Sequence, residues 1–429
     1  MKSLTACVSH SGNFVSESVT KPKDNLELLL RCLVFGLASF LLVVATMRDI
    51  KDLQVGHPQK YREFGTFWAS GFAAAHGQNP YSSYPLTWKI HPIFGNSFLV
   101  KDVNLQPPCM LPFFEFVSHF DPQRGVRVWS ITSLAAFIFG TALIFTIRRG
   151  ELQKRQIVWL LLAPAVTDTQ LLGQDYVLLF LFAAIAWAAL ERDKYFLADL
   201  CIGILVAMKP NLLLWPLLLF LAGYRRSAVR IAVVAGSITL IPVFRYGPGI
   251  YRLWLEAAAK YPHSMIPTDV SITAFFIRLG IAPLGIVVTA VLMGSIMMIV
   301  ALYRPKAIDI APMAICTAIL CSPIAWYQYV VMLAPFFVAR RWDKKSNLAA
   351  LLLFVPSIIP ALSMAGGPFV AVLGGLPYFA AFWIILVLSV QCLSDEGIGQ
   401  TAGSFSNDGE PVTTREAVRI GYGNREVVP

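Results

Sequence analysis

The feature that most constrains this chain is a succession of long apolar runs separated by short polar connections. Several runs approach the roughly twenty residues that a helix needs to cross about 30 Å of hydrocarbon. Helices suit that environment because they satisfy their own backbone polar groups. Only 14% of the residues are charged, whereas a typical soluble domain carries about a quarter. The sequence therefore predicts an all-α polytopic membrane protein.

The apolar runs also predict how the chain is divided. A polar tail at 1–27 without a signal-peptide core precedes a first span at 28–47. Residues 48–127 mix aromatic residues with prolines, which is typical of an external loop carrying interfacial, juxtamembrane helices. A flexible cytoplasmic tail is expected at 393–429, leaving a transmembrane domain at 28–392. With the first span, later runs predict about twelve transmembrane helices, at roughly 128–147, 156–172, 176–190, 195–208, 211–222, 229–244, 282–303, 307–321, 326–339, 346–364 and 368–391.

The distribution of positive charge predicts the orientation of these spans. Basic residues occupy alternate connections, for example at Arg148, Arg225, Arg304 and Arg340. Such loops usually face the cytoplasm, so both termini should lie there as well. The net charge of +10 is then a topology signal, and it does not indicate a nucleic-acid partner. We expect an integral protein of a bacterial cytoplasmic membrane, surrounded by membrane lipids.

Motifs for cofactors are missing from the sequence. The seven cysteines lie mostly in or beside apolar segments without metal-ligand spacing, so they predict neither a disulfide framework nor a zinc site. No nucleotide phosphate loop or HExxH motif occurs. This argues against ATP-driven transport and against a soluble nucleotide-sugar donor. We expect no cofactor and no metal.

Lys209 is the strongest physical signal among the polar residues. It separates the apolar pieces CIGILVAM and LLLWPLLLF, each too short for a comfortable crossing, so its ammonium should lie below the membrane surface. A lipid-linked phosphate would be a natural partner, because the ion pair offsets the cost of dehydration. Pro210 breaks the helix there and would free backbone donors for the same anion. The alternative is a lysine that extends to the lipid headgroups at a tight turn.

Other polar residues should lie on the same, non-cytoplasmic side. Glu63 starts a short helix outside the first span, where an enzyme acting on lipid-borne substrates would keep a proton acceptor. Gln174 could hydrogen-bond a sugar or phosphate, and Asp175 could accept from a sugar or pair with Lys209. A solvated surface charge and an ordinary polar turn are the alternatives for these residues.

Two aromatic segments accompany them on that side. The segment from Arg245 to Ser271 could bind a headgroup or a carbohydrate, and the turn from Ser322 to Tyr329 packs aromatic residues around Gln328. Interface anchoring alone would explain most of these side chains. It explains Gln328 less readily.

Taken in order, the motifs resemble glycosyltransferase family 87, the GT-C class membrane enzymes that use polyprenyl-phosphate mannose. The first-loop pattern of that family, an acidic-aromatic pair, an alanine-rich helix and Gly-x-Asn/Asp-Pro-Tyr, is similar to the stretch from Glu63 to Tyr81. Later motifs are similar to Pro107-Pro108, Gly173-Gln174, Lys209-Pro210 and Ser322-Pro323-Ile324-Ala325-Trp326. The sequence departs from the family pattern at Glu63 (aspartate), Gln106 (tyrosine), Gln328 (histidine) and Asp269-Val270-Ser271 (Asn-Gln-Ser).

The resemblance implies a GT-C-type fold and an inverting transfer of a hexose, with mannose favoured, from a polyprenyl-phosphate donor to a glycolipid or glycan acceptor. Glu63 would be the general base. Lys209 and Arg245 would hold the donor phosphate. The resemblance and the residue types together assign sugar or substrate binding to Gln174, Asp175, Asn211, Tyr327 and Gln328. A secondary transporter or flippase of lipid-linked sugars, and an inactive scaffold derived from such an enzyme, are the competing interpretations.

Overall fold

The computed structural model describes residues 30–33, 35–37, 62–82, 103–261, 266–363 and 366–401. Within these ranges the chain is predominantly helical and contains no strand, and Asp269 and Trp326 form an isolated antiparallel bridge. The all-α prediction is therefore confirmed for the described part of the chain. The predicted tail at 1–27, most of the predicted first span at 28–47, and residues 402–429 lie outside the described residues.

The helices follow one another through short connections. In chain order they are α2 (Arg62–Ala75), η3 (Pro108–Met110), α4 (Leu111–Ser118), α5 (Pro122–Ile147), α6 (Lys154–Leu162), α7 (Pro164–Leu172), α8 (Tyr176–Leu190), α9 (Tyr195–Met208), η4 (Pro210–Leu213), α10 (Leu214–Leu221), α11 (Arg225–Tyr246), α12 (Gly249–Lys260), α13 (Ile272–Arg278), α14 (Ala282–Tyr303), α15 (Ala307–Leu320), η5 (Tyr327–Tyr329), α16 (Val330–Val338), α17 (Lys344–Leu352), α18 (Ile358–Ser363) and α19 (Gly367–Thr401).

Four of the described helices are long and apolar enough to cross a membrane: Arg124–Ile147, Arg225–Tyr246, Ala282–Tyr303 and Gly367–Leu393. These spans make the chain an integral membrane protein. Shorter apolar helices account for most of the other runs, so the count of twelve crossings is not confirmed. Proline is one reason, because it lacks a donor and interrupts helical hydrogen bonding. Pro164 divides the run at 156–172 into α6 and α7, and the run at 346–364 divides into α17 and α18. At the other end, α19 continues to Thr401, past the expected boundary at 392.

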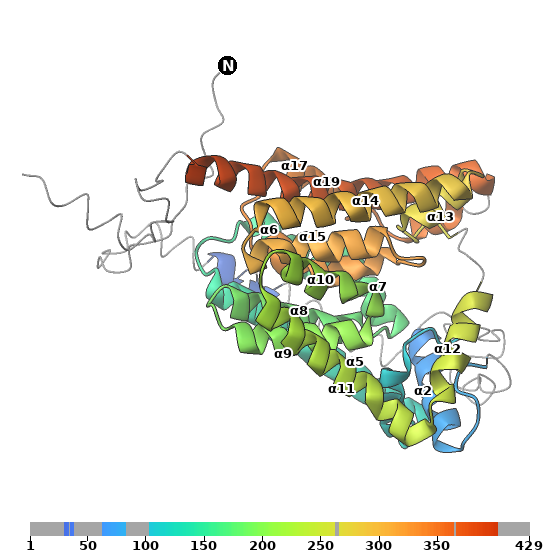
Figure 1. Cartoon of the computed structure of the whole chain (residues 1–429). Helices are drawn as coiled ribbons and strands as arrows, with labels where there is room; N and C mark the ends of the chain where they lie inside the picture. The colour runs from blue at the N-terminus through green and yellow to red at the C-terminus, as the bar shows by residue number, and fades with distance from the viewer. Residues whose placement is uncertain are drawn as a thin grey trace, which may run out of the picture.

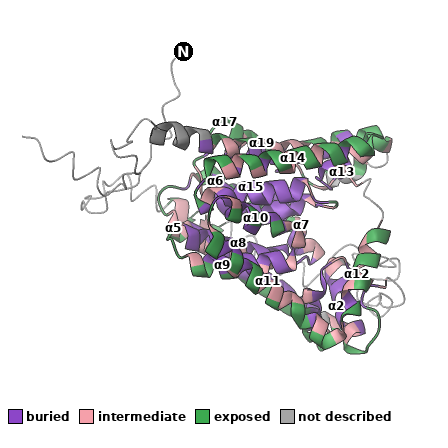
Figure 2. Ribbon diagram, in the orientation of Figure 1, coloured by how far each residue is buried: buried purple, intermediate pink, exposed green. Residues whose placement is uncertain are grey.

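The helices are arranged in two main layers (Figure 1). In this view α14, α15 and α19 lie in the upper layer, and α5, α8, α9 and α11 in the lower one. The inner faces of both layers belong to one apolar core, whereas the outer faces of α11 and α14 are largely exposed (Figure 2). Exposed apolar side chains such as Phe244 and Leu302 are expected where a helix faces lipid.

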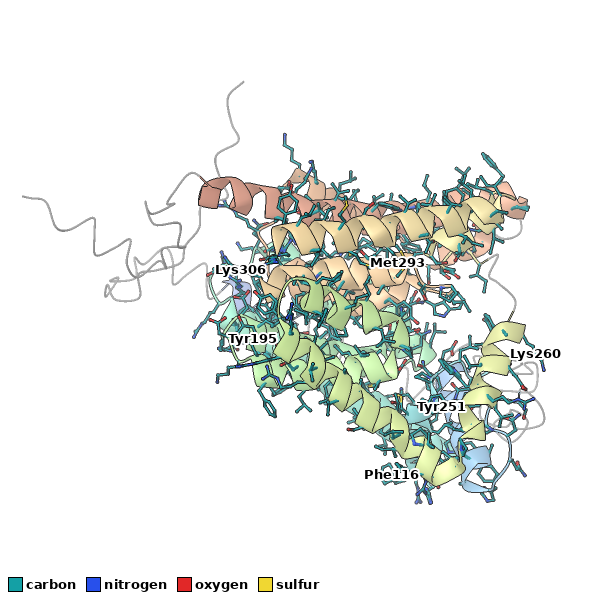
Figure 3. All side chains as sticks on the ribbon, viewed as in Figure 1. Phe116, Tyr195, Tyr251, Lys260, Met293 and Lys306 are labelled. Carbon is teal, nitrogen blue, oxygen red and sulfur yellow. The ribbon has the colours of Figure 1, made fainter. Side chains whose placement is uncertain are left out.

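A second, aromatic cluster holds the first-loop helices at one end of the molecule. Phe67 of α2 stacks on Phe114 of α4 with ring centroids 4.6 Å apart, and Ile250 of α12 is buried in the same cluster. Figure 3 shows Tyr251 of α12 at this end and Lys306 at the opposite end. The described part of the predicted first loop is therefore helical, and the interfacial position of these helices remains a prediction. Which end faces the cytoplasm remains a prediction.

Gly71 of α2 sets how closely α2 approaches α4. A Cβ atom at this position would lie 2.1 Å from the backbone oxygen of Phe114. We therefore expect Gly71→Ala to lower stability by about 1–3 kcal/mol through overpacking. Gly236→Ala in α11 is the matched control, since a Cβ there meets nothing within 4 Å. Thermal unfolding of both purified variants tests this, and a Gly71→Ala protein as stable as the native chain would contradict the close approach of α2 and α4.

Candidate active site

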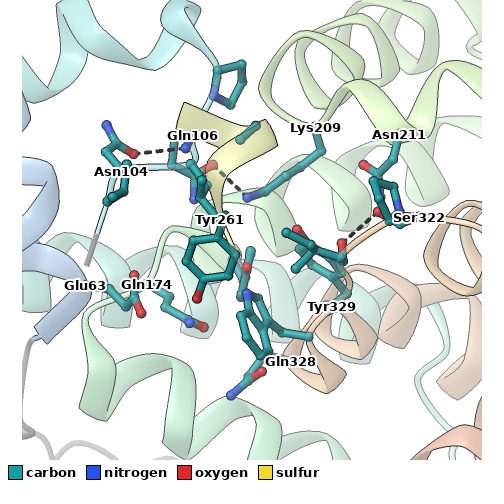
Figure 4. Close-up of a pocket in the computed structure, with 18 of the residues that line it drawn as sticks. Glu63, Asn104, Gln106, Gln174, Lys209, Asn211, Tyr261, Ser322, Gln328 and Tyr329 are labelled. Carbon is teal, nitrogen blue, oxygen red and sulfur yellow. Dashed lines mark hydrogen bonds between the residues drawn. The ribbon is translucent and has the colours of Figure 1, made fainter. Parts of the chain in front are cut away.

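A cavity of about 580 Å³ opens at the end of the molecule that carries α2 and α12. Its walls come from the start of α2, the loop before η3, the turns before α8 and η4, the end of α12, and the loop before η5. Figure 4 shows part of this lining. The lining residues are Glu63, Phe67, Val103, Asn104, Leu105, Gln106, Pro107, Leu172, Gln174, Tyr176, Lys209, Pro210, Asn211, Trp254, Ala258, Tyr261, Ile266, Thr268, Ser322, Pro323, Ile324, Trp326, Gln328 and Tyr329.

Glu63 and Lys209 carry the two charges among these lining residues. Glu63 lies in the first turn of α2, where the helix dipole favours an ionised carboxylate. The next residue, Phe64, is fully buried in the aromatic cluster and fixes the start of the helix. Lys209 lies at the break between α9 and η4, and only 6% of it is exposed. An acidic and a basic side chain of opposite charge therefore face one cavity.

Lys209 is held by a polar and an aromatic environment. Its Nζ donates to Gln106 Oε1 at 2.7 Å and lies 3.7 Å from Asp175 Oδ2. The same ammonium lies over the rings of Tyr176 and Tyr329, at 4.6 and 5.4 Å from their centroids. Aromatic faces stabilise a cation that is removed from water. The predicted alternative pairing of Asp175 with Lys209 is thus present in the structure.

Buried amides supply the remaining polarity of the cavity. Gln174 and Gln328 are each 6% exposed, and the Oε1 atom of each has no hydrogen-bond partner among the described residues. The same holds for the Nδ2 atom of Asn104. Gly173 allows Gln174 to face the cavity, since it ends α7 in the left-handed conformation at φ 68°. Buried groups of this kind normally find partners, so the cavity is suited to a ligand rich in hydroxyl groups.

The structure brings most of the predicted site residues together. Glu63, Lys209, Gln174, Asn211 and Gln328 line the cavity. In Figure 4, Glu63 and Gln174 lie on one side of the view and Asn211 on the other. Asp175 is fully buried behind Lys209. The predicted roles of these residues remain proposals.

Like Asp175, the predicted residues Arg245 and Tyr327 do not line the cavity. Arg245 of α11 forms two hydrogen bonds with Glu115 of α4, at 2.6 and 2.8 Å, and Glu115 also accepts from Tyr246. The Arg245 guanidinium therefore pairs with a carboxylate outside the cavity. Tyr327 is fully buried, and its hydroxyl donates to Asp168. Both side chains tie helices together in the structure.

Several lining residues were not singled out from the sequence as site residues. Asn104 gave no signal, because it lies in an irregular stretch of the first loop. Gln106 was noted only as a departure from the family pattern, although it contacts Lys209 directly. Trp254, Tyr261 and Thr268 belong to the segment from Arg245 to Ser271, for which the sequence left both ligand binding and interface anchoring open. The proline pair after Gln106 is the one sequence feature that marks this loop.

The wall formed by the loop at 266–271 is fixed to the turn before η5. The Thr268 carbonyl accepts from the Tyr327 backbone N–H at 2.9 Å. Asp269 Oδ1 accepts from the backbone N–H groups of Ser271 and Ala325, at 3.0 and 3.1 Å. Because Thr268 lines the cavity, these hydrogen bonds hold one wall of the site in place.

Asp269 predicts a pH dependence of stability. Burial raises the pKa of Asp269 from 3.8 to about 6, although its hydrogen bonds and Arg278 oppose the shift. The pKa of Asp269 is therefore higher in the folded than in the unfolded state. Its contribution to the free energy of unfolding falls as pH rises from about 4 to 6, and above that window the buried, ionised carboxylate destabilises the fold. In Asp269→Asn, Oδ1 can keep both accepted bonds. We expect this variant to gain about 1–3 kcal/mol at pH 7.5 and to lose that advantage towards pH 4.5.

Thermal unfolding across this pH range tests the effect. Asp121→Asn is the control, because it changes an exposed carboxylate at the start of α5 and asparagine caps a helix equally well. A stability difference between Asp269→Asn and the native chain that stayed constant from pH 4.5 to 7.5 would contradict titration of Asp269 in this window.

Among the described residues, no group of three or more histidine, cysteine, aspartate or glutamate side chains is arranged to hold a metal ion. The expectation of a metal-independent site remains a prediction.

Membrane-crossing helices and a cavity that carries one carboxylate and one ammonium group define an integral membrane protein with an enzyme-like site. The model of glycosyltransferase family 87 matches residues 104–323, and because this range is more than half of the chain, the protein belongs to that family. The solved structure of ArnT from Cupriavidus metallidurans bound to undecaprenyl phosphate is similar at 13% identity, covering 85% of this chain and 78% of that one, with a TM-score of 0.37. No curated protein matches the chain.

Proposed function

We propose that this protein transfers a hexose, with mannose favoured, from a polyprenyl-phosphate carrier to a glycolipid or glycan acceptor on the non-cytoplasmic side of the membrane. The observation that carries the proposal is the pair of opposite charges, Glu63 and Lys209, on one cavity of a family 87 protein. The cavity volume of about 580 Å³ lies within the range of about 300–1,000 Å³ that is usual for ligand sites.

The reaction would be an inverting single displacement. Glu63 accepts the proton of an acceptor hydroxyl while that oxygen forms a bond to the anomeric carbon of the donor sugar. The bond from that carbon to the phosphate oxygen breaks, and the electron pair leaves with the polyprenyl phosphate. Lys209 stabilises the growing negative charge on the phosphate. No step requires a metal.

The amides of the cavity would select the sugar. Gln174 and Gln328 offer unpartnered carbonyl oxygens to sugar hydroxyls, and Asn104 offers a donor. Asn211 lies on the same cavity and adds a further amide. Sites built around buried amides reject ligands that leave those groups unpaired. These neutral amides therefore favour a sugar rich in hydroxyl groups.

The proposal is tested by measuring sugar transfer with the purified protein in lipid nanodiscs. Radiolabelled polyprenyl-phosphate mannose is supplied with a membrane lipid extract as acceptor, beside a panel of other polyprenyl-phosphate sugars. Labelled glycolipid from any of these donors supports the reaction class, and the panel identifies the sugar. If no donor gives a product, the transferase proposal fails, and movement of lipid-linked sugars across the membrane becomes the next activity to measure.

A further inference from the structure

The side chain of Gln106 lies between the two charges of a buried ion pair. Its Oε1 atom accepts from Lys209 Nζ at 2.7 Å, and its Nε2 atom donates to Asp175 Oδ1 at 3.0 Å. The Lys209 nitrogen and the Asp175 Oδ2 oxygen stay 3.7 Å apart, which is longer than an ordinary hydrogen bond between nitrogen and oxygen. An amide can bridge the two groups because it is both an acceptor and a donor.

Three contacts fix the loop that presents Gln106. The Asn104 side chain accepts from the Gln106 backbone N–H at 2.9 Å. The Tyr81 hydroxyl donates to the Gln106 carbonyl at 3.2 Å, and the Trp254 indole donates to the neighbouring carbonyl of Leu105 at 3.0 Å. Tyr81 closes the Gly-Gln-Asn-Pro-Tyr motif, whose turn is held by a 2.9 Å bond from the Tyr81 N–H to Asn79 Oδ1. Gln106 is therefore held in place before any ligand binds.

This arrangement leaves Lys209 able to bind a ligand. An ammonium has three donors, and one of them is used by Gln106. The rings of Tyr176 and Tyr329 contact the cation with their faces, and they offer it no oxygen in the contacts described. Without the amide between them, Asp175 and Lys209 would attract each other strongly in this buried environment. A close pair would compete with any anion that enters the cavity.

We propose that Gln106 is a positioning residue that keeps Asp175 from closing on Lys209, so that the ammonium remains available to the phosphate of the lipid carrier. This inference rests on the proposed function, because it concerns the same donor-phosphate site. The first-loop motif would then have a structural role, since its Tyr81 holds the Gln106 carbonyl. Asn104 would act in the same way through the Gln106 backbone N–H. It also assigns Asp175 the role of a counter-charge held at a distance.

Equilibrium binding to the purified full-length protein tests this role. The probe is farnesyl phosphate, a soluble short-chain polyprenyl phosphate, and uncharged farnesol is the reference ligand in isothermal titration calorimetry. We expect Gln106→Leu to weaken farnesyl phosphate binding by about tenfold or more, as for loss of a hydrogen bond to a charged group. Binding of farnesol should not change, because it lacks the phosphate. Gln106→Asn, which keeps the amide but is too short to bridge both groups, should fall in between.

The double variant Gln106→Leu/Asp175→Asn separates positioning from general support of the fold. Removing the competing carboxylate should restore most of the affinity for farnesyl phosphate, whereas a purely structural defect would persist. Gln170→Leu is the matched control. Like Gln106, Gln170 carries a buried amide, but it lies in α7 and does not line the cavity. Thermal unfolding of each variant shows whether it is folded.

The outcomes are distinct. Weaker phosphate binding in Gln106→Leu that recovers in the double variant supports the positioning role. Native affinity in a folded Gln106→Leu protein, or no recovery in the double variant, overturns that role and leaves the transferase proposal intact. A native protein that binds farnesol and farnesyl phosphate equally overturns the donor-phosphate site, and the positioning role with it.

Discussion

Glu63→Gln is expected to reduce sugar transfer by about 10²–10⁴-fold, the usual contribution of a general base. Glutamine has nearly the same shape as glutamate but cannot accept the proton of the acceptor hydroxyl. Because Glu63 lies at the start of α2 and its neighbour Phe64 holds that turn in the aromatic cluster, the variant should fold normally. Transfer from polyprenyl-phosphate mannose in nanodiscs, together with the thermal midpoint, gives the two necessary readouts.

Two further variants make this prediction specific. Glu256→Gln removes an exposed carboxylate of α12 that does not line the cavity, so transfer should stay near the native rate. Glu63→Asp keeps the proton acceptor but shortens it by one methylene, and we expect partial activity because the carboxylate is displaced from its target. Full activity in a folded Glu63→Gln protein would exclude Glu63 as the base.

The sequence predicted the all-α class correctly, whereas its count of about twelve crossings is not confirmed by the described helices. Apolar composition is enough to predict membrane helices, because few charged residues can be tolerated in hydrocarbon. It does not show where a helix breaks. Pro164 divides the single run at 156–172 into α6 and α7, a break that hydropathy does not record.

The candidate site was predictable where short motifs carried it, and unpredictable where distant residues meet. Glu63, Gln174 and Lys209 stand beside a helix start, a glycine turn and a proline, so their positions were marked in the sequence. Arg245 looked available for phosphate, yet it pairs with Glu115, a residue 130 positions earlier in the chain. The bridge made by Gln106 likewise joins three separate segments, and no local pattern predicts such a contact.

Lys209→Met is expected to lose both transfer and stability. Loss of a cation that stabilises the leaving phosphate should lower the rate by about 10²–10³-fold, as for removal of one donor to a developing negative charge. The same change leaves the fully buried carboxylate of Asp175 without its counter-charge. Breaking a buried pair on one side typically costs about 3–5 kcal/mol. The single variant therefore cannot distinguish catalysis from folding.

The double variant Lys209→Met/Asp175→Asn makes that distinction. It removes both charges, so no unpaired buried ion remains and the thermal midpoint should return towards the native value. Sugar transfer should stay as low as in Lys209→Met, since nothing replaces the ammonium facing the cavity. Recovery of transfer together with stability would mean that Lys209 serves only to balance Asp175, and the phosphate would then have to be held by the amides and backbone donors around Pro210. Persistently low transfer in a stable protein would place the leaving phosphate at Lys209.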